Sequence, residues 1–537
     1  MLIIAIISGR IISWFGRIFN LGAGGTWPGE VALILNPNIL QGLVAHIKKG
    51  IIVVAGTNGK TTTSLMIVKI LEQHGYSVVH NSSGANLLNG VVSACIQKAN
   101  WLGKLSADWG VFEVDENSLP IVISQLSSRL SETHGGIYHN PKSGVKDSST
   151  PLRFARNDNA LIIVLLNLFR DQLDRYGEVD VIAEKWSKAL KNLPAKTTFV
   201  LNADDPLIAH LGNSVILEGV PLNGTTDRIL DKKILSQQTS SLLQNDVKVR
   251  YFGIEDKTQF LKTREHATDS TFCLSCGHHL NYSGIYFSHL GIWKCDNCGA
   301  KRPQPHVSKV KIGLPGLYNE YNALAALSVA KSLNLDDQTT HDTLQNFQPA
   351  FGRQEEFVID SIASLQNDNP KRIKVFLAKN PAGFNASLRT VLELISNCHP
   401  RPDRGSTISI DSRLRGNDDV LLLILNDRIP DGRDVSWIWD VDFEMIPENM
   451  MVIVSGDRVY DLALRVKYAQ KSQIPILKFQ SKPNRNNSKP VMFIEPGLKN
   501  AIQTGLGKIK AGETLYILPT YSAMLEVRKI LGGRKIL

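Results

Sequence analysis

The chain has 537 residues, of which 43% are hydrophobic and 7% aromatic. This composition is typical of a soluble globular protein and excludes a disordered or fibrous one. Since a domain takes roughly 150 residues, several domains are expected. The 60 Lys and Arg residues exceed the 50 Asp and Glu residues by ten, and the net charge of +10 favours an anionic partner without identifying it.

Residues 1–19, MLIIAIISGRIISWFGRIF, form an apolar segment that contains Arg10 and Arg17. The apolar run precedes the basic residues and no small-residue cleavage site follows, which argues against a signal peptide. The run is also too short and interrupted for a spanning helix, which needs ~20 apolar residues. We expect an amphipathic helix that docks on its own domain or, less favoured, lies on a membrane surface with Trp14. No other stretch could span a bilayer, so the predicted location is the cytoplasm.

Residues 50–75 read as a buried strand, a glycine-rich turn and an amphipathic helix. In such a phosphate-binding loop, backbone N–H groups cradle phosphates, Lys60 reaches the outer phosphates and the Thr61 hydroxyl binds magnesium. Val54 replaces the first glycine of the usual motif. The spacing nevertheless predicts ATP binding rather than a structural turn, through Gly56, Thr57, Asn58, Gly59, Lys60, Thr61 and Thr62.

The next predicted strand, in DWGVFEVDENS, delivers Glu113, Asp115 and Glu116. Carboxylates at a strand end beside a phosphate-binding loop hold the metal of a Mg-ATP site, although any one of them could belong to a solvated loop. The segments ALIIVLLNLFRD and TFVLNADDP repeat the pattern of a buried strand with a polar tip. Repeated units of this kind predict a parallel sheet with its ligand at the carboxyl ends of the strands.

Four of the six cysteines, Cys273, Cys276, Cys295 and Cys298, form two C-x-x-C pairs. In a cytosolic chain this spacing indicates a zinc ribbon rather than two disulfides, and four thiolates leave no open position for catalysis. We therefore expect a structural Zn²⁺ in a ribbon over about residues 268–304. A nucleic-acid-binding ribbon stays open as the less favoured alternative, because five basic or histidine residues lie nearby: His278, His279, Lys294, Lys301 and Arg302.

Several motifs occur together in the order found in Mur ligases and folylpolyglutamate synthetases: GTNGKTTT, NLFRDQLDRYGE, LNADDP, GLYNEYNALAA, GRQEEF and LAKNPAG. The four-cysteine insert and the tail motifs NDRIPDGRDVSWIWDVDFE and LPTYSAML narrow the resemblance to the MurT family. The resemblance runs from about residue 24 nearly to the end of the chain. It implies an α/β fold with three parts: an N-terminal helical segment (1–45), a Mur-ligase-like central domain (46–357) that carries the ribbon, and a C-terminal Rossmann-like domain (358–537).

The resemblance also implies roles for particular residues. Lys60 and Thr61 would contact ATP and magnesium, with Glu113 as the metal carboxylate. Asn319, Asn322 and Arg353 would close the nucleotide site from the second half of the chain, although an Asn in YNEYNALAA could equally be a helix cap. Asn81 and Asn86, in the segment HNSSGAN, would face the sugar-linked substrate.

The chain departs from stand-alone Mur ligases at two motifs. Their D-H-L-D reads DQLD at residues 171–174 here, and their A-H-N-P reads AKNP at residues 378–381. A histidine metal ligand is therefore missing, which puts a second magnesium in doubt. Two polar blocks with similar spacing, at about residues 130–158 and 399–419, interrupt the resemblance and are predicted to be inserted surface loops.

In the MurT family the implied reaction is ATP-dependent amidation of the D-glutamate α-carboxylate of the lipid II stem peptide, through an acyl phosphate. Neither remaining cysteine is a convincing glutaminase nucleophile, since Cys95 lies in the apolar segment VVSACIQKA and Cys398 borders an insertion. The ammonia would therefore come from a GatD-type glutamine amidotransferase in a heterodimer. The resemblance implies that Asp434 of DGRD completes the partner's Cys-His pair, whereas the residues alone favour a turn or helix cap.

Two rival functions stay open. A ligase that adds a whole amino acid to a folate or muropeptide would work alone and would not need DGRDVSW. A nucleic-acid-binding ATPase would use the ribbon, and its binding to oligonucleotides would depend strongly on salt. The enclosure of the ribbon within a ligase framework disfavours the second rival, so no nucleic-acid partner is expected.

Overall fold

The computed structural model describes most of the chain. The residues that it describes are 2–18, 26–81, 85–101, 103–131, 160–171, 178–194, 196–218, 248–348, 353–359, 370–398, 420–447, 450–472 and 492–532. Both predicted insertions, at 130–158 and 399–419, lie almost wholly or wholly outside these residues.

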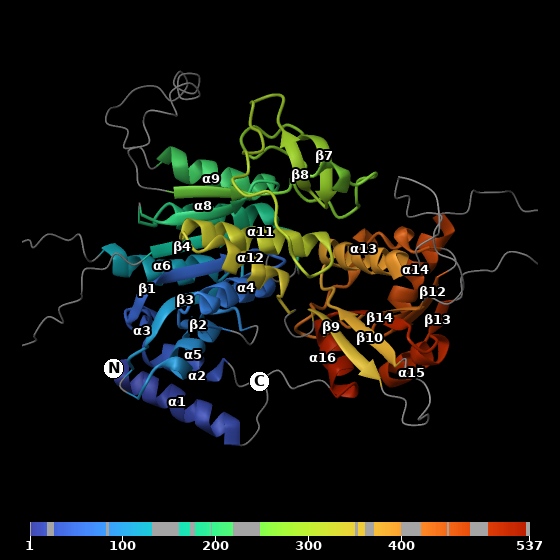
Figure 1. Cartoon of the computed structure of the whole chain (residues 1–537), viewed down its shortest axis with the longest axis horizontal. Coiled ribbons are helices and arrows are strands. Elements are labelled where there is room, and N and C mark those ends of the chain that lie inside the picture. Colours follow the sequence, from blue (N-terminus) through green and yellow to red (C-terminus); the bar gives the residue numbers. More distant parts are fainter. Residues whose placement is uncertain are drawn as a thin grey trace, which may run out of the picture.

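The central domain is built on a six-stranded parallel sheet of order β2-β3-β1-β4-β5-β6 (Figure 1). Its strands in chain order are β1 (Ile47–Ala55), β2 (Val78–His80), β3 (Ala107–Val114), β4 (Ala160–Leu165), β5 (Thr198–Asn202) and β6 (Lys248–Phe252). Alternate residues of β1 enter two different cores: Ile51, Val53 and Ala55 face one side, Ile52 and Val54 the other. A strand buried on both faces reads as a continuous apolar run, as IIVVA does.

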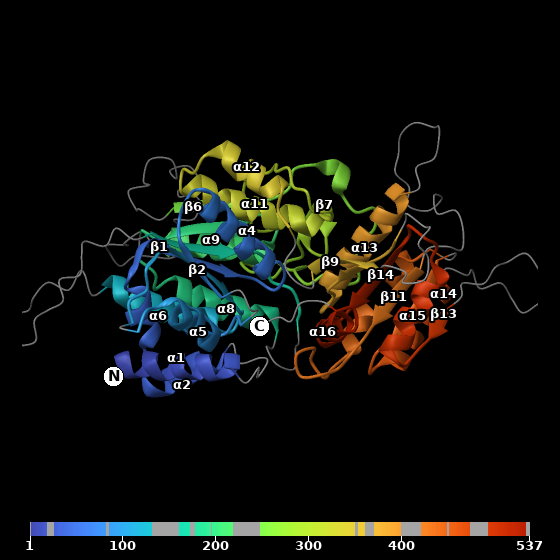
Figure 2. The same ribbon diagram turned by 60° about the horizontal axis from the view of Figure 1, so that its bottom comes forward.

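Two groups of helices cover this sheet. One face packs on α4 (Lys60–Gln73), α11 (Leu317–Ser332) and α12 (Asp337–Gln345). The other packs on α5 (Leu88–Lys98), α6 (Leu119–Ser131), α8 (Val179–Leu190) and α9 (Pro206–Glu218). Beyond α5 lie α1 (Leu2–Ile18) and α2 (Trp27–Leu35), at the lower edge of the molecule in Figures 1 and 2. The short helix α3 (Ile39–Val44) is buried against α5 and α6.

The second sheet has the order β13-β12-β11-β14-β10-β9 and is parallel except for its edge strand β9. Its strands are β9 (Arg353–Ile359), β10 (Lys371–Phe376), β11 (Val420–Ile424), β12 (Met451–Ser455), β13 (Met492–Ile494) and β14 (Thr514–Pro519). The helices α13 (Pro381–Cys398) and α14 (Val459–Ser472) cover one face, and α15 (Leu498–Lys508) and α16 (Tyr521–Ile530) the other. This sheet begins at Arg353, a few residues before the boundary predicted at 358, because an isolated antiparallel edge strand carries no βαβ pattern.

The four-cysteine segment forms a small module on the central domain. Its hairpin, β7 (Asn281–Phe287) and β8 (Leu290–Lys294), follows the short 3-10 helix η1 (Lys257–Gln259). Trp293 donates its indole N–H to the Ala203 carbonyl at 3.1 Å, and Tyr286 and Phe287 enter the core beneath α11. The module is therefore packed into the domain rather than tethered to it.

Asp204 joins the tip of β5 to this module and to α11. Its carboxylate accepts hydrogen bonds from Arg302 Nε at 2.6 Å, the Tyr321 hydroxyl at 2.6 Å and the Ile254 N–H at 2.9 Å. The side chain is fully buried, and burial raises its pKa even though Arg302 opposes this shift. Asp204, the first aspartate of LNADDP, thus connects β5, the module and α11.

The substitution Asp204→Ala should destabilise the central domain, because it removes the anionic partner of the buried Arg302 guanidinium and the acceptor of the Tyr321 hydroxyl. Removal of one partner from a buried ion pair costs about 3 kcal/mol or more. Thermal unfolding followed by circular dichroism would measure the effect, with Asp256→Ala, an exposed cap of η1, as the control. Equal melting temperatures for the two variants would refute this role.

Candidate functional site

The turn between β1 and α4 is held in place by the segment that follows β4. Asn167 accepts the Asn58 N–H at 2.8 Å with its side chain and the Thr57 N–H at 3.0 Å with its carbonyl, and donates its amide to the Asn58 carbonyl at 3.1 Å. Thr57 completes the contact by exchanging hydrogen bonds with the Phe169 backbone. Two strand tips therefore fix the loop before any ligand arrives.

Gly59, at the start of α4, could not carry a side chain. Its φ of +89° lies in the left-handed region, and a Cβ atom would come within 2.1 Å of Asn322 Oδ1. The same Asn322 oxygen accepts the Thr63 hydroxyl at 3.2 Å. The close approach of α11 to the loop explains why glycine stands at this position.

Lys60 and Thr61, the first residues of α4, each meet a carboxylate from β3 or its tip. Lys60 Nζ lies 2.6 Å from the Gly56 carbonyl and 3.2 Å from Glu116 Oε2, and both charged side chains are buried. The Thr61 hydroxyl donates to Glu113 Oε1 at 3.0 Å. Glu113 and Glu116 therefore both reach the phosphate loop.

Glu113 has the features of a magnesium ligand. Its second oxygen, Oε2, is buried without a hydrogen-bond partner, while its first shares the Thr61 hydroxyl. Asn81 fixes the backbone on which it stands, since its side chain donates to the Glu113 carbonyl at 2.8 Å and accepts the Glu113 N–H at 2.9 Å. A carboxylate and a threonine hydroxyl are the ligands that Mg²⁺ takes beside such a loop, so these two side chains fit the ion.

Asn81 and Asn86 lie beside this carboxylate. Asn81 is buried and also donates to the Ala85 carbonyl at 2.9 Å, and the Asn86 carbonyl accepts the Asp115 N–H at 2.8 Å. The side chain of Asn81 thus positions Glu113, while its predicted contact with the substrate stays a prediction, as does that of Asn86.

The buried acids respond to their neighbours in opposite directions. Burial raises the pKa of Asp115, and the charge of Glu116 raises it further. Burial alone would raise the pKa of Glu116 as well, but the Lys60 and Lys379 cations lower that pKa below its ordinary value. Glu116 is consequently an anion that neutralises Lys60 while no phosphate is bound.

The second half of the chain closes over the loop, as the motifs imply. Asn319 and Asn322 project from α11, and Arg353 begins β9; all three line one cavity with Asn58, Gly59 and Thr62. Asn319 donates to the Pro315 carbonyl at 2.7 Å, whereas Gly316 occupies the position that caps α11. The remaining walls are mostly apolar and include Phe287, Leu314, Tyr318, Phe376 and Leu377.

The C-terminal domain reaches the loop through AKNP. Asn380 exchanges two side-chain hydrogen bonds with Asn58, at 3.2 and 3.1 Å. Lys379 forms an ion pair with Asp171 across the two domains and lines the same cavity. Burial alone would lower the pKa of Lys379, but Asp171 and Glu116 raise it, so the side chain is a cation. Sequence reasoning assigned no role to this pair, because its members are 208 residues apart.

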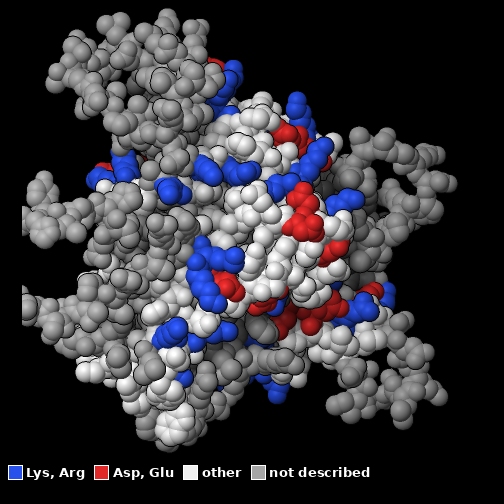
Figure 3. Space-filling model, turned by 60° about the vertical axis from the view of Figure 1, so that its left-hand side comes forward, with Lys and Arg blue, Asp and Glu red and all other residues white. Residues whose placement is uncertain are grey.

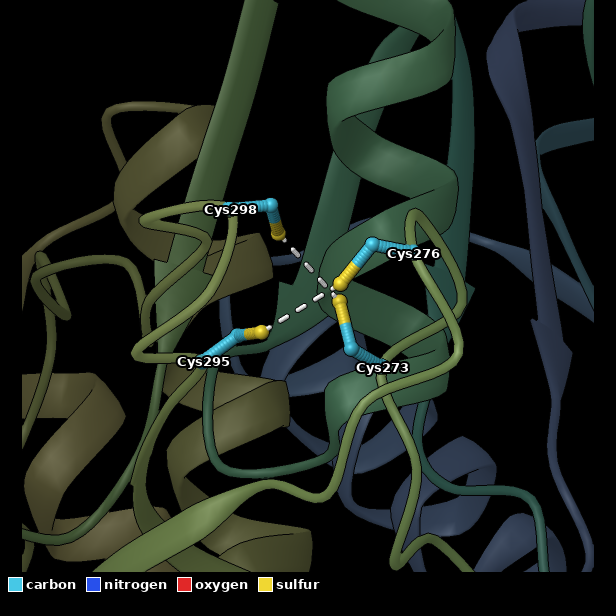
Figure 4. A group of neighbouring side chains, drawn as sticks. All are labelled: Cys273, Cys276, Cys295 and Cys298. Atoms are coloured by element: carbon cyan, nitrogen blue, oxygen red, sulfur yellow. Dashed lines mark hydrogen bonds between the residues drawn. The ribbon is translucent and has the colours of Figure 1, made fainter.

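The four cysteines converge on one point (Figure 4). Cys273 Sγ lies 3.5 Å from Cys298 Sγ, and Cys276 Sγ lies 3.5 Å from Cys295 Sγ, so each C-x-x-C pair faces the other. Disulfide bonds need ~2 Å. A tetrahedron with metal–sulfur distances of ~2.3 Å sets the sulfurs nearly 4 Å apart, so the thiolates fit Zn²⁺.

Part of the basic surface expected near the ribbon is already engaged. The Arg302 side chain is buried against Asp204, and Lys294 pairs with Asp296 at 2.8 Å. The His279 ring contacts the Phe272 ring in a tilted arrangement, with ring centroids 4.2 Å apart. These contacts weaken the nucleic-acid-binding alternative, since a phosphate contact needs free cations.

The two aspartates of DGRD have opposite environments. Asp431 is buried and binds the Ser522 N–H at 2.9 Å, and burial raises its pKa. Asp434 is exposed at the start of the 3-10 helix η3 (Ser436–Asp440) and accepts the Ser436 N–H at 2.8 Å and its hydroxyl at 2.9 Å. The turn expected from the residues alone is therefore present, and Asp434 is the aspartate that another chain could reach.

Cys95 is confirmed as a core residue. It is fully buried on α5, and burial raises the pKa of its thiol to about 12, which rules out a nucleophilic thiolate.

Among the described helices, none has the length and apolar character needed to cross a bilayer.

Several known proteins are similar to this chain in sequence or in fold. Residues 377–524 match the family model "MurT ligase C-terminal". The curated MurT subunit of lipid II isoglutaminyl synthase (glutamine-hydrolyzing) from Staphylococcus aureus (strain COL) is 28% identical over 85% of this chain and 86% of its own. The MurT subunit from Streptococcus pneumoniae (strain ATCC BAA-255 / R6) is 28% identical over 96% of this chain and 94% of its own.

Among solved structures, a pseudomurein peptide ligase type C from Methanothermus fervidus aligns with a TM-score of 0.52 and 19% identity. The alignment covers 90% of this chain and 79% of that one. This likeness confirms the predicted α/β fold of Mur-ligase type. The chain is therefore similar over most of its length to the curated MurT subunits, it has an α/β fold of Mur-ligase type, and its residues 377–524 match the MurT ligase C-terminal domain.

Proposed function

We propose that this chain is the ligase subunit of a glutamine-dependent amide synthase that converts the D-glutamate α-carboxylate of lipid II to D-isoglutamine in peptidoglycan biosynthesis. The observation that carries the proposal is the Lys60, Thr61 and Glu113 constellation, closed by Lys379 of a MurT-type C-terminal domain. Curated relatives that span nearly the whole chain are named as subunits of such a synthase.

The geometry supports activation of a carboxylate by phosphoryl transfer. The loop from Gly56 to Gly59 would bind the phosphates through its N–H groups, and Lys60 would move from Glu116 to the outer phosphates. Thr61 and Glu113 would hold a Mg²⁺ ion, which neutralises phosphate charge when bound. Transfer of the terminal phosphoryl group to the carboxylate gives an acyl phosphate and ADP; ammonia then displaces phosphate and leaves the amide.

Lys379 supplies a cation where stand-alone Mur ligases use histidine. Its ion pair with Asp171 holds the charged amino group of Lys379 at the wall of the nucleotide cavity. Negative charge would accumulate there as the phosphoryl group moves. We infer that this lysine replaces the second metal site in function and binds the transferred phosphoryl group. The pair also fixes the C-terminal domain over the loop.

The ammonia would come from a GatD-type partner. Free ammonia is scarce at neutral pH, and Cys95 is inert. The exposed carboxylate of Asp434 would orient the partner's catalytic histidine, as the aspartate of a Ser-His-Asp triad does. Because both of its oxygens already bind Ser436, the side chain is held in one orientation for that contact.

The decisive experiment is amidation of lipid II by the purified chain with ATP and magnesium, followed by mass spectrometry. Ammonium alone should support exchange of a carboxyl for an amide, and glutamine should do so only with a GatD-type glutaminase. Turnover with a free amino acid and no partner would instead favour the amino-acid ligase. No product under any condition, from a folded chain that binds ATP, would overturn the proposal.

The substitution Asp434→Asn should lower glutamine-driven amidation at least about 100-fold, because an asparagine cannot stabilise the histidine cation. Ammonium-driven amidation serves as the internal control and should not change, since Asp434 lies outside the nucleotide cavity. Equal losses in both reactions, or none in either, would contradict the shared triad.

The substitution Lys379→Met should reduce ammonium-driven kcat roughly 100-fold, because the cation at the transferred phosphoryl group is lost. Lys374→Met is a matched control: Lys374 belongs to the same domain, is similarly exposed and pairs only with Glu356 among the described residues. ATP affinity, measured separately, should fall much less than kcat. A variant with normal kcat would exclude this role.

We also propose that the four cysteines bind one structural Zn²⁺. The knuckles CLSCG and CDNCG are alike, since in each the first cysteine carbonyl accepts the N–H of the following glycine, Gly277 at 2.8 Å and Gly299 at 3.0 Å. The hairpin between them delivers Phe287 to the wall of the nucleotide cavity. Metal binding would therefore stabilise the ATP site indirectly.

Elemental analysis should find one zinc ion per chain. The substitution Cys295→Ser should release it, lower the melting temperature and weaken ATP binding, because Phe287 loses its support. Cys95→Ala is the control, since it also removes a buried thiol but none of the predicted zinc ligands. Full metal content in the Cys295 variant would rule out the four-thiolate site.

A further inference from the structure

The N-terminal helix α1 has two faces of different character. One face packs on the domain: Ala5, Ile6 and Gly9 are buried, and a side chain at Gly9 would meet the Pro28 carbonyl and Ile96 of α5 within about 3 Å. The docked helix expected from the sequence is therefore present. Such close packing leaves the opposite face directed away from the domain.

That opposite face is apolar where a water-exposed helix should be polar. Ile4, Ile11 and Trp14 follow one another at helical spacing and are 59%, 44% and 57% exposed. The neighbouring helix α2 exposes Trp27 and Ile34 in the same way, Ile34 at 76%. Scattered apolar residues are common on surfaces, but a continuous stripe with two tryptophans close by marks an interaction surface.

A third tryptophan joins the stripe through a cation. Trp101, in the connection between α5 and β3, is 57% exposed, and the Arg10 guanidinium of α1 lies 4.5 Å from its ring centroid. Exposed Lys98 and Lys104 flank Trp101 in the sequence. The N-terminal apolar face therefore consists of Ile4, Ile11, Trp14 and Trp101, with Arg10 among them.

The charge of α1 has one sign, whereas on α2 the exposed Glu30 lies between Trp27 and Ile34. Residues 1–29 contain two arginines and no Asp or Glu, and the first acidic residue is Glu30. In Figure 3 the described surface at the lower end of the molecule, where α1 lies, is mostly white, and both Lys or Arg and Asp or Glu residues appear above it. Tryptophan, apolar side chains and cations without acids are the composition of helices that lie in the interface of an anionic bilayer.

We propose that the N-terminal apolar face docks the enzyme on the surface of an anionic lipid bilayer. Ile4, Ile11 and Trp14 would enter the boundary between head groups and acyl chains, and Arg10, Lys98 and Lys104 would contact the anionic head groups. The helix lies on the membrane and does not cross it.

This face adjoins the side of the site where the substrate is predicted to bind. The helix α1 packs on α5, and α5 starts just after the segment of Asn81 and Asn86, which adjoins Glu113. The inference rests on the proposed function in one respect: a lipid-linked substrate explains why the enzyme should bind a bilayer. The surface itself follows from exposure and charge alone.

Flotation with vesicles tests the proposal with the full chain. The vesicles are phosphatidylglycerol–phosphatidylcholine mixtures without lipid II, ATP or partner, so the result is independent of the proposed reaction. The chain should float with anionic vesicles, less with pure phosphatidylcholine, and less at high salt because exposed cations are screened. The double variant Ile11→Glu and Trp14→Glu should bind at least roughly tenfold more weakly.

A matched control carries the same change on the other domain. Tyr460 and Leu464 are exposed one turn apart on α14, and Tyr460→Glu with Leu464→Glu should leave flotation unchanged. Circular dichroism and ammonium-driven amidation of a detergent-soluble substrate confirm that both variants fold. Flotation that survives the α1 variant, or no flotation at all, overturns the proposal. Light scattering that shows a dimer broken by this variant would assign the face to a second copy instead.

Discussion

The phosphate-binding loop cannot form its site alone, and the rest of the structure follows from this constraint. Gly56 to Lys60 provide hydrogen-bond donors and one cation. The carboxylate that would hold magnesium, the walls of the cavity and further positive charge must come from other elements. Glu113 arrives from β3, Asn167 follows β4, Asn322 comes from α11 and Lys379 from the second domain. A parallel sheet brings these strand ends to one edge, and the cavity lies there.

Charge neutralisation organises the site before ligands bind. Lys60 is paired with Glu116 and Lys379 with Asp171, so each cation is held by an acid that a phosphate could displace. Unpaired charges in such a buried place would be costly. The pairing thus offsets this cost, and the Lys379 pair also joins the two domains across the cavity.

The four-cysteine ribbon is part of this arrangement, because it is packed into the central domain. Asp204 joins it to β5 and α11, Trp293 ties it to the backbone after β5, and Phe287 reaches the nucleotide cavity. The segment that leads from η1 to the first C-x-x-C pair also contacts the C-terminal domain. In this segment Glu265 pairs with Arg389, and His266 pairs with Asp442. A thiolate-bound metal would therefore hold a small hairpin at the junction of both domains.

Local patterns in the sequence were enough to predict the phosphate loop, the parallel central sheet and the two C-x-x-C pairs, because glycine spacing, buried strands with polar tips and cysteine spacing involve only neighbouring residues. Motif order also predicted Glu113, Asn322 and Arg353 as nucleotide-site residues, and the structure brings all three to the phosphate loop or its cavity. Only the tertiary structure decided which acid meets which lysine, that Asn81 supports Glu113, and that Asp204 is structural. Residues such as Asp171 and Lys379 are brought together by domain packing, which leaves no signal in either local sequence. The outward face of α1 was equally undecided, since periodicity shows that a helix is amphipathic but not which apolar side chains the domain will cover.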